Sequence, residues 1–199
     1  MKLEILKFPT KSLKESSEKI DVDAFQVDGI GTKMLSDLKN LIGEMDHLVY
    51  RFGALGLAAP QVGVNKRIIV VKTQRRIPEG TGISSSYQYD KPVSLNSSPN
   101  TLNYTAMINP EVVQKSEKTR RMNEGCLSFP NASAWITRPE FLKVKWFDIY
   151  SMSYREDTFS DLEASIVGHE MDHLNGVLLV DKLGPLKSKF TQEYFKKNR

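Results

Sequence analysis

The sequence predicts an α+β fold: one compact domain over residues 1–199, with antiparallel or mixed sheets around a central helix and another helix at the C-terminus. Three observations predict it. Strand-like segments gather in the middle of the chain, with helix-like segments before and after them, unlike the regular alternation of βαβ proteins. The chain has 199 residues, enough for one sizeable core but short for two. Hydrophobic residues make up 40% and charged residues 26% of it, as in ordinary globular proteins, and no apolar run is long enough to cross a membrane.

The first expected helix covers residues 31–50. Apolar side chains recur there at helical spacing: Leu35, Leu38, Leu41, Ile42, Met45 and Leu48. Residues 52–64 are rich in small side chains, which suit a close backbone approach better than a regular element. Residues 67–73 read RIIVVKT and predict a buried strand.

The middle of the chain is predicted to hold an insertion and two strands. Residues 74–105 are polar and rich in Ser, Asn, Gly and Pro. Unstructured connections of this length are uncommon inside compact domains, so we interpret the segment as a surface insertion, with a hairpin as one form. Residues 106–113 predict a short strand interrupted at Pro110, and the alternating residues 141–150 predict another strand.

Two helices are expected in the last third of the chain. Thr158 is the expected N-cap of an amphipathic helix over residues 162–174. Pro185 suits the first turn of a helix, which predicts a basic C-terminal helix over residues 185–199. That tail carries Lys187, Lys189, Lys196, Lys197 and Arg199 against Glu193, while the whole chain has a formal net charge of +4. The basic character therefore belongs to the tail, and neither a DNA-binding domain nor a membrane partner is indicated.

The compartment is expected to be the cytoplasm. The N-terminal residues have neither the apolar stretch of a signal peptide nor the Arg-rich composition of a transit peptide. The single cysteine, Cys126, cannot form an intramolecular disulfide, which favours a reducing compartment.

The strongest chemical signal is the sequence HEMDH at residues 169–173, inside the second predicted helix. Side chains at i and i+4 lie on one helical face, so His169 and His173 can bind the same metal ion. Glu170 can accept a proton from water at such an ion. Two histidines leave the site one protein ligand short, because catalytic metals usually take three and keep one position open.

Three residues are candidates for the third ligand. A metzincin would need histidine at position 179, where the chain has Leu179. A thermolysin-like enzyme would use a downstream glutamate, which here is Glu193 in the basic tail. Cys126 is the only thiol, and a thiolate is a strong ligand, although a lone cysteine is usually a small buried hydrophobe. The residues alone leave Glu193 and Cys126 open. His47, the third histidine, is interpreted as a surface or cap residue.

Three blocks together resemble the signature of the peptide deformylases. They are ALGLAAPQ at residues 54–61, EGCLS at 124–128 and HEMDH at 169–173. The similarity extends to residues 66–70, 108–110 and 172–176. It implies a metal-dependent hydrolase that removes the N-formyl group from the N-terminal formylmethionine of newly made polypeptides and releases formate.

The resemblance also implies roles for individual residues. The metal ligands would be Cys126, His169 and His173, holding one divalent ion that is Fe²⁺ in cells, with Zn²⁺ or Ni²⁺ in purified protein. Glu170 would be the general base and then the general acid. The Gln61 side-chain amide and the Leu127 backbone N–H would form the oxyanion hole. Gly56 would line the cleft.

A methionine side chain needs an apolar pocket. Its candidate walls are Leu55, Ser165, Ile166 and Trp135, since Ser165 and Ile166 share a helical face with His169. Arg138 could place a charge in the cleft, pair with Glu124 beside the metal site, or lie solvated on the surface.

The chain departs from the family pattern at three places. Ala54 replaces a common glycine, Gly168 replaces a larger polar residue, and the insertion at 74–105 is longer than in the simplest members. Two other functions are weighed against the deformylase: a zinc endopeptidase using Glu193, and a non-catalytic binding module that docks through the basic tail. The tail at 185–199 suggests a ribosome contact, with a solvated helix as the alternative.

Overall fold

The computed structural model describes residues 3–27, 29–73 and 104–184. The expected insertion at 74–105 lies outside the described residues except for its last two positions, which belong to a strand. The expected helix at 185–199, with Glu193, also lies outside them. No helix in the described ranges is long and apolar enough to span a membrane.

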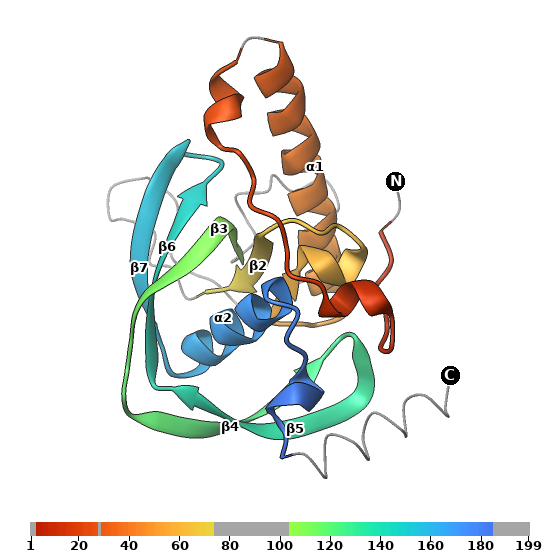
Figure 1. The fold of residues 1–199 in the computed structure, drawn as a ribbon, viewed down its shortest axis with the longest axis vertical. Coiled ribbons are helices and arrows are strands. Elements are labelled where there is room, and N and C mark those ends of the chain that lie inside the picture. Colours follow the sequence, from red (N-terminus) through yellow and green to blue (C-terminus); the bar gives the residue numbers. More distant parts are fainter. Residues whose placement is uncertain (1–2, 28, 74–103, 185–199) are drawn as a thin grey trace.

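The larger of the two sheets has five antiparallel strands and lies along one side of α2 (Figure 1). Its strand order is β1-β2-β3-β6-β7. The strands are β1 (Gly56–Ala58), β2 (Ile68–Lys72), β3 (Tyr104–Lys115), β6 (Phe141–Asp148) and β7 (Ser153–Ser160). A separate antiparallel pair is formed by β4 (Thr119–Cys126) and β5 (Phe129–Pro139). The predicted α+β class, with antiparallel sheets, is confirmed.

Two helices pack against opposite faces of the five-stranded sheet. They are α1 (Ile30–Arg51) and α2 (Asp161–Leu174), and Figure 1 shows α2 enclosed between the large sheet and the β4–β5 pair. Short 3₁₀ helices occupy the connections: η1 (Lys11–Lys14), η2 (Asp23–Gln26), η3 (Ala59–Val62) and η5 (Leu179–Lys182). The central position predicted for the helix with the HEMDH sequence is therefore confirmed.

The residues of β2 explain why both of its faces are buried. Successive side chains of a strand point to opposite faces. Ile68 and Val70 belong to the core cluster that contains α1, whereas Ile69 and Val71 belong to the cluster that contains α2. A strand covered on both faces needs a continuous apolar run, which is what the sequence has here.

One detail of the predicted elements is wrong, and one is right with different bounds. Thr158 is not the N-cap of α2, because it lies in β7 opposite Lys143 of β6; the N-cap is Ser160, whose side chain makes no capping hydrogen bond. The interruption predicted at Pro110 is confirmed, but the strand is longer than the expected 106–113. It continues to Lys115, and a register shift between Ile108 and Glu111 accommodates the proline, which cannot donate to a regular ladder.

One buried acid on α1 leads to a stability prediction. Asp46 is buried, its Oδ1 has no hydrogen-bond partner in the described part of the chain, and desolvation raises its pKa to about 7. Below its unfolded pKa of 3.8 Asp46 is neutral in both the folded and the unfolded protein, so burying it carries no ionisation cost. As the pH rises, the unfolded state loses this proton first, and the free energy of unfolding therefore falls until the pH passes about 7.

Asp46→Asn is therefore expected to raise the free energy of unfolding at pH 8 by about 2 kcal/mol, since each pKa unit corresponds to about 1.4 kcal/mol and the buried amide offsets part of the gain. Urea unfolding of both proteins at pH 5 and pH 8 measures this. The difference between variant and wild type should be larger at pH 8. An equal difference at both values would show that Asp46 does not titrate in this range.

Candidate active site and metal centre

A strand end and a helix bring three ligand-type side chains together. Cys126 ends β4, where the β4–β5 register shifts after Gly125. His169 and His173 lie one turn apart on the buried face of α2. The ligand atoms of the three residues all lie within 4.8 Å of one another, and Cys126 Sγ is 3.2 Å from His173 Nε2. Within the described ranges no other group of three such side chains is this close.

Glu124 orients the first histidine. Its Oε2 lies 2.9 Å from His169 Nδ1, which leaves His169 Nε2 free to face the thiol and the second histidine. Arg138 donates to Glu124 from Nε at 2.7 Å and from Nη2 at 2.8 Å, and it also pairs with Asp172. Burial alone would raise the pKa of Glu124, but hydrogen bonds to Arg138 and His169 outweigh burial and hold it at about 2. Glu124 therefore stays ionised.

Of the three roles expected for Arg138, the structure shows the pair with Glu124. The side chain is buried rather than solvated. It does not line the pocket described below. Gly168 lies beside it: a Cβ added there would be 3.6 Å from Arg138 Nη1 and 3.5 Å from Leu142 Cδ1, which are ordinary contacts.

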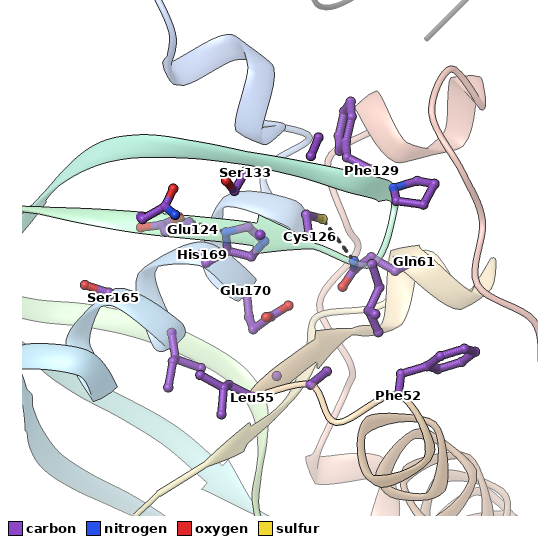
Figure 2. A pocket seen from close by; sticks show the side chains of 18 of the residues that line it. Phe52, Leu55, Gln61, Glu124, Cys126, Phe129, Ser133, Ser165, His169 and Glu170 are labelled. Atoms are coloured by element: carbon purple, nitrogen blue, oxygen red, sulfur yellow. Dashed lines mark hydrogen bonds and ion pairs between the residues drawn. The ribbon is translucent and has the colours of Figure 1, made fainter. Parts of the chain in front are cut away.

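Glu170 is the acid that is free for chemistry. It is buried on α2, and its Oε2 has no hydrogen-bond partner among the residues described. Burial raises its pKa to about 7. An acid with a pKa near the working pH is suited both to accept and to return a proton. Figure 2 shows its carboxyl group pointing into the pocket beside His169.

Gln61 faces the same space from η3. Its Oε1 accepts from the Ala58 N–H at 2.9 Å, which fixes the orientation of the amide. Its Nε2 therefore points at Cys126 Sγ, 3.5 Å away, and at Ser128 Oγ, 3.2 Å away, as the dashed line in Figure 2 marks for Cys126. Leu127, next to Cys126 in the chain, lies on the wall of the same pocket.

A pocket of about 680 Å³ surrounds these groups. Its wall contains the predicted residues Leu55, Gly56, Ser165 and Ile166, together with Cys126, Leu127, His169, Glu170 and Gln61. His173 is fully enclosed behind them.

Trp135 was a wrong candidate for the wall. It lies opposite Asn123 in the β4–β5 pair, is 60% exposed and has the Arg121 guanidinium 5.7 Å from its ring. The β4–β5 pair contributes Met122, Glu124 and Ser133 to the wall instead. His47 is exposed, as predicted.

Sequence reasoning missed several wall residues, among them Lys7, Phe52, Phe129 and Leu162. Leu162 could have been found from its helical spacing, because it precedes Ile166 by one turn. The other three belong to segments that no local sequence pattern places beside the pocket.

Comparisons with known proteins agree with this geometry. The family model described as polypeptide deformylase matches residues 2–189. A peptide deformylase of Erythrobacter litoralis is 34% identical over 197 residues, covering 98% of this chain and 96% of the relative. One from Zymomonas mobilis is 34% identical, covering 93% of this chain and 88% of the relative. The chain belongs to the peptide deformylase family.

Solved structures of deformylases share the fold. The peptide deformylase of Ehrlichia chaffeensis superimposes with a TM-score of 0.73 at 29% identity, covering 100% of this chain and 97% of that one. That of Thermotoga maritima gives 0.68 at 29% identity, covering 93% and 99%. The chain is therefore a hydrolase that removes the N-formyl group from nascent peptides. The buried Cys126, His169 and His173 suit the single metal ion on which this family depends.

Because Gly56 has no side chain, the Glu170 carboxyl can pack directly against its backbone. A Cβ added to Gly56 would lie 2.6 Å from Glu170 Oε1 and 2.9 Å from its Cγ. Gly56→Ala is therefore expected to displace the carboxyl and lower kcat/KM by about 10²-fold, the loss typical of a misplacement of 1 Å. Steady-state formate release measures it.

Gly43→Ala is the matched control, because a Cβ at Gly43 on α1 meets nothing within 4 Å. It should leave kcat/KM unchanged. If Gly56→Ala is as active as Gly43→Ala, the position of Glu170 does not control turnover.

Proposed function

We propose that Cys126, His169 and His173 hold one divalent metal ion, and that this centre performs the deformylation. The observation that carries the proposal is the convergence of one thiol and two imidazoles within 4.8 Å. Two buried polar atoms without partners in the described ranges, His173 Nδ1 and Glu170 Oε2, lie in or beside this group. One sulfur and two nitrogen donors are a ligand set of the kind that catalytic zinc sites use.

The metal in cells is proposed to be Fe²⁺, as the family resemblance implies. Zinc and nickel bind such sites more tightly than iron in the general affinity order. Purified protein is therefore expected to contain Zn²⁺ or Ni²⁺ when it is exposed to them.

In the proposed reaction, Glu170 accepts a proton from water as the water oxygen attacks the formyl carbon. When bound, the metal ion polarises the formyl carbonyl and lowers the pKa of a nearby water toward neutrality. The Gln61 amide and the Leu127 N–H donate to the formyl oxygen as negative charge develops on it. Glu170 then returns the proton to the leaving nitrogen, so that formate and a free N-terminus are released. Its raised pKa and enclosed position support this double role.

The methionine side chain is proposed to enter the pocket along Leu55, Gly56, Ser165 and Ile166. These residues line the same cavity as Glu170. Arg138 is proposed to act on the reaction only through Glu124, because it lies behind the pocket wall. The Glu193 of the endopeptidase alternative is not needed, since Cys126 completes a set of three ligands.

The deciding experiment measures formate release from formyl-Met-Ala-Ser under anaerobic conditions, with metal analysis of the same sample. We expect release that scales with about one metal ion per chain. Full activity in metal-free protein would contradict the proposal.

The chain is further proposed to act as one catalytic domain over residues 1–199 in the cytoplasm, where nascent chains emerge and the thiol of Cys126 stays reduced. The basic tail at 185–199 is proposed to contact ribosomal RNA. Co-sedimentation with ribosomes should then weaken as salt rises. Binding that does not depend on salt, or no binding, would exclude this contact.

A further inference from the structure

The N-terminal segment, defined as residues 6–8, contacts both proposed oxyanion donors. The Leu6 N–H donates to the Gln61 carbonyl at 2.7 Å, and Lys7 Nζ donates to the Leu127 carbonyl at 2.6 Å. Gln61 and Leu127 come from separate elements, η3 and the turn after β4. The segment thus joins two parts of the site that are 66 residues apart in sequence.

This segment is held firmly on the turn after β4. The Phe8 N–H donates to the Ser128 carbonyl at 2.9 Å, and the Phe8 ring stacks on Phe129 with centroids 5.0 Å apart. Both rings are buried in a cluster with Leu13 and Ile136. In Figure 1 the red N-terminal segment accordingly lies beside the turn between β4 and β5.

Lys7 differs from its neighbours because its contact to the site is made by the side chain. Lys7 is exposed, lines the pocket as its only lysine or arginine among the described residues, and forms no ion pair within them. Its contact with Leu127 is therefore not a by-product of a salt bridge. A hydrogen bond from an ammonium to a carbonyl is stronger than a neutral one.

We propose that Lys7 is a positioning residue for deformylation, acting through Leu127. The Leu127 carbonyl belongs to the peptide that follows the residue, and the Leu127 N–H belongs to the peptide before it. Only the φ and ψ rotations of Leu127 separate these two peptides, so a fixed carbonyl narrows the range of directions in which the N–H can point. The proposal rests on the proposed oxyanion role of Leu127.

Lys7→Met tests this, with steady-state kinetics on formyl-Met-Ala-Ser. We expect kcat to fall about 10-fold, a part of the 10²–10³ lost when an oxyanion donor is removed. KM should change less than about twofold, because the Leu127 N–H is proposed to donate to the formyl oxygen mainly as negative charge develops on it in the transition state. Metal content and melting temperature should match wild type. Lys7→Arg, which keeps the charged donor, should recover most of kcat, and Lys11→Met, at an exposed lysine on η1, should have no effect.

Three results would overturn the proposal: an unchanged kcat in Lys7→Met, an effect on KM alone, or no recovery in Lys7→Arg. Gln61→Met separates this failure from failure of the oxyanion assignment. If Gln61→Met lowers kcat and Lys7→Met does not, the oxyanion role of Gln61 stands and the positioning of Leu127 by Lys7 is wrong. If Gln61→Met also leaves kcat unchanged, the oxyanion site itself is misassigned.

Discussion

Glu170→Ala is expected to lower kcat for formate release by a factor of about 10²–10⁴, the contribution typical of a positioned general acid–base group. The reason is that Glu170 is the buried acid that faces the pocket without a hydrogen-bond partner for its Oε2 among the described residues. Glu124, which also lines the pocket, is held ionised between Arg138 and His169 and cannot take over the proton.

Metal analysis and a melting curve accompany this measurement. Both should be close to wild type, because Glu170 is not one of the three converging ligands. Glu170→Gln, which keeps the shape of the side chain, should lose as much activity as Glu170→Ala. A Glu170→Ala enzyme that turns over at the wild-type rate would exclude the acid–base role.

Cys126→Ser is expected to weaken metal binding by more than about 100-fold. A serine hydroxyl stays protonated at neutral pH, so the variant replaces a thiolate with a weak neutral donor. This loss is expected to exceed that caused by removing a residue that only orients a metal ligand, which typically lowers metal affinity 10–100-fold. Titration against a competing chelator measures the affinity.

Glu124→Gln is the graded comparison, since Glu124 contacts His169 Nδ1 but is not one of the converging ligands. Its loss of affinity should be smaller than that of Cys126→Ser. Unchanged metal stoichiometry and affinity in Cys126→Ser would remove Cys126 from the centre.

The elements that the sequence predicted well are those buried on a clear face or on both faces. The helix expected at 31–50 is Ile30–Arg51, and the strand expected at 67–73 is Ile68–Lys72. The spacing of their apolar residues shows which face is buried, so these elements can be predicted from a single sequence. Their position relative to each other depends on contacts that no local pattern contains.

The strands β4, β5 and β7 were missed because none shows a clear apolar alternation: β4 and β7 are mostly polar, and β5 has a proline near each end. Most residues of β7 are exposed, and the outward face of β4 carries Arg121 and Asn123. Such strands are specified by pairing with a neighbour rather than by apolar alternation. Thr158 was misassigned for the same reason, since its side chain suits a helix cap and a strand equally well.

The sequence named the three side chains that converge in the structure, but not the contacts that hold them in place. Spacing alone placed His169 and His173 on one face, whereas the choice of Cys126 over Glu193 depended on a family signature. The pair of Arg138 with Glu124 was one alternative among three. The contacts of Leu6, Lys7 and Phe8 could not be predicted, because they join segments that are far apart in sequence.

The measurement that tests the metal centre most directly is X-ray absorption at the metal edge of zinc-loaded wild-type protein. One sulfur at about 2.3 Å and two imidazole nitrogens at about 2.0–2.1 Å are the predicted nearest atoms. A spectrum that fits only nitrogen and oxygen neighbours would mean that the thiol and the imidazoles do not share an ion.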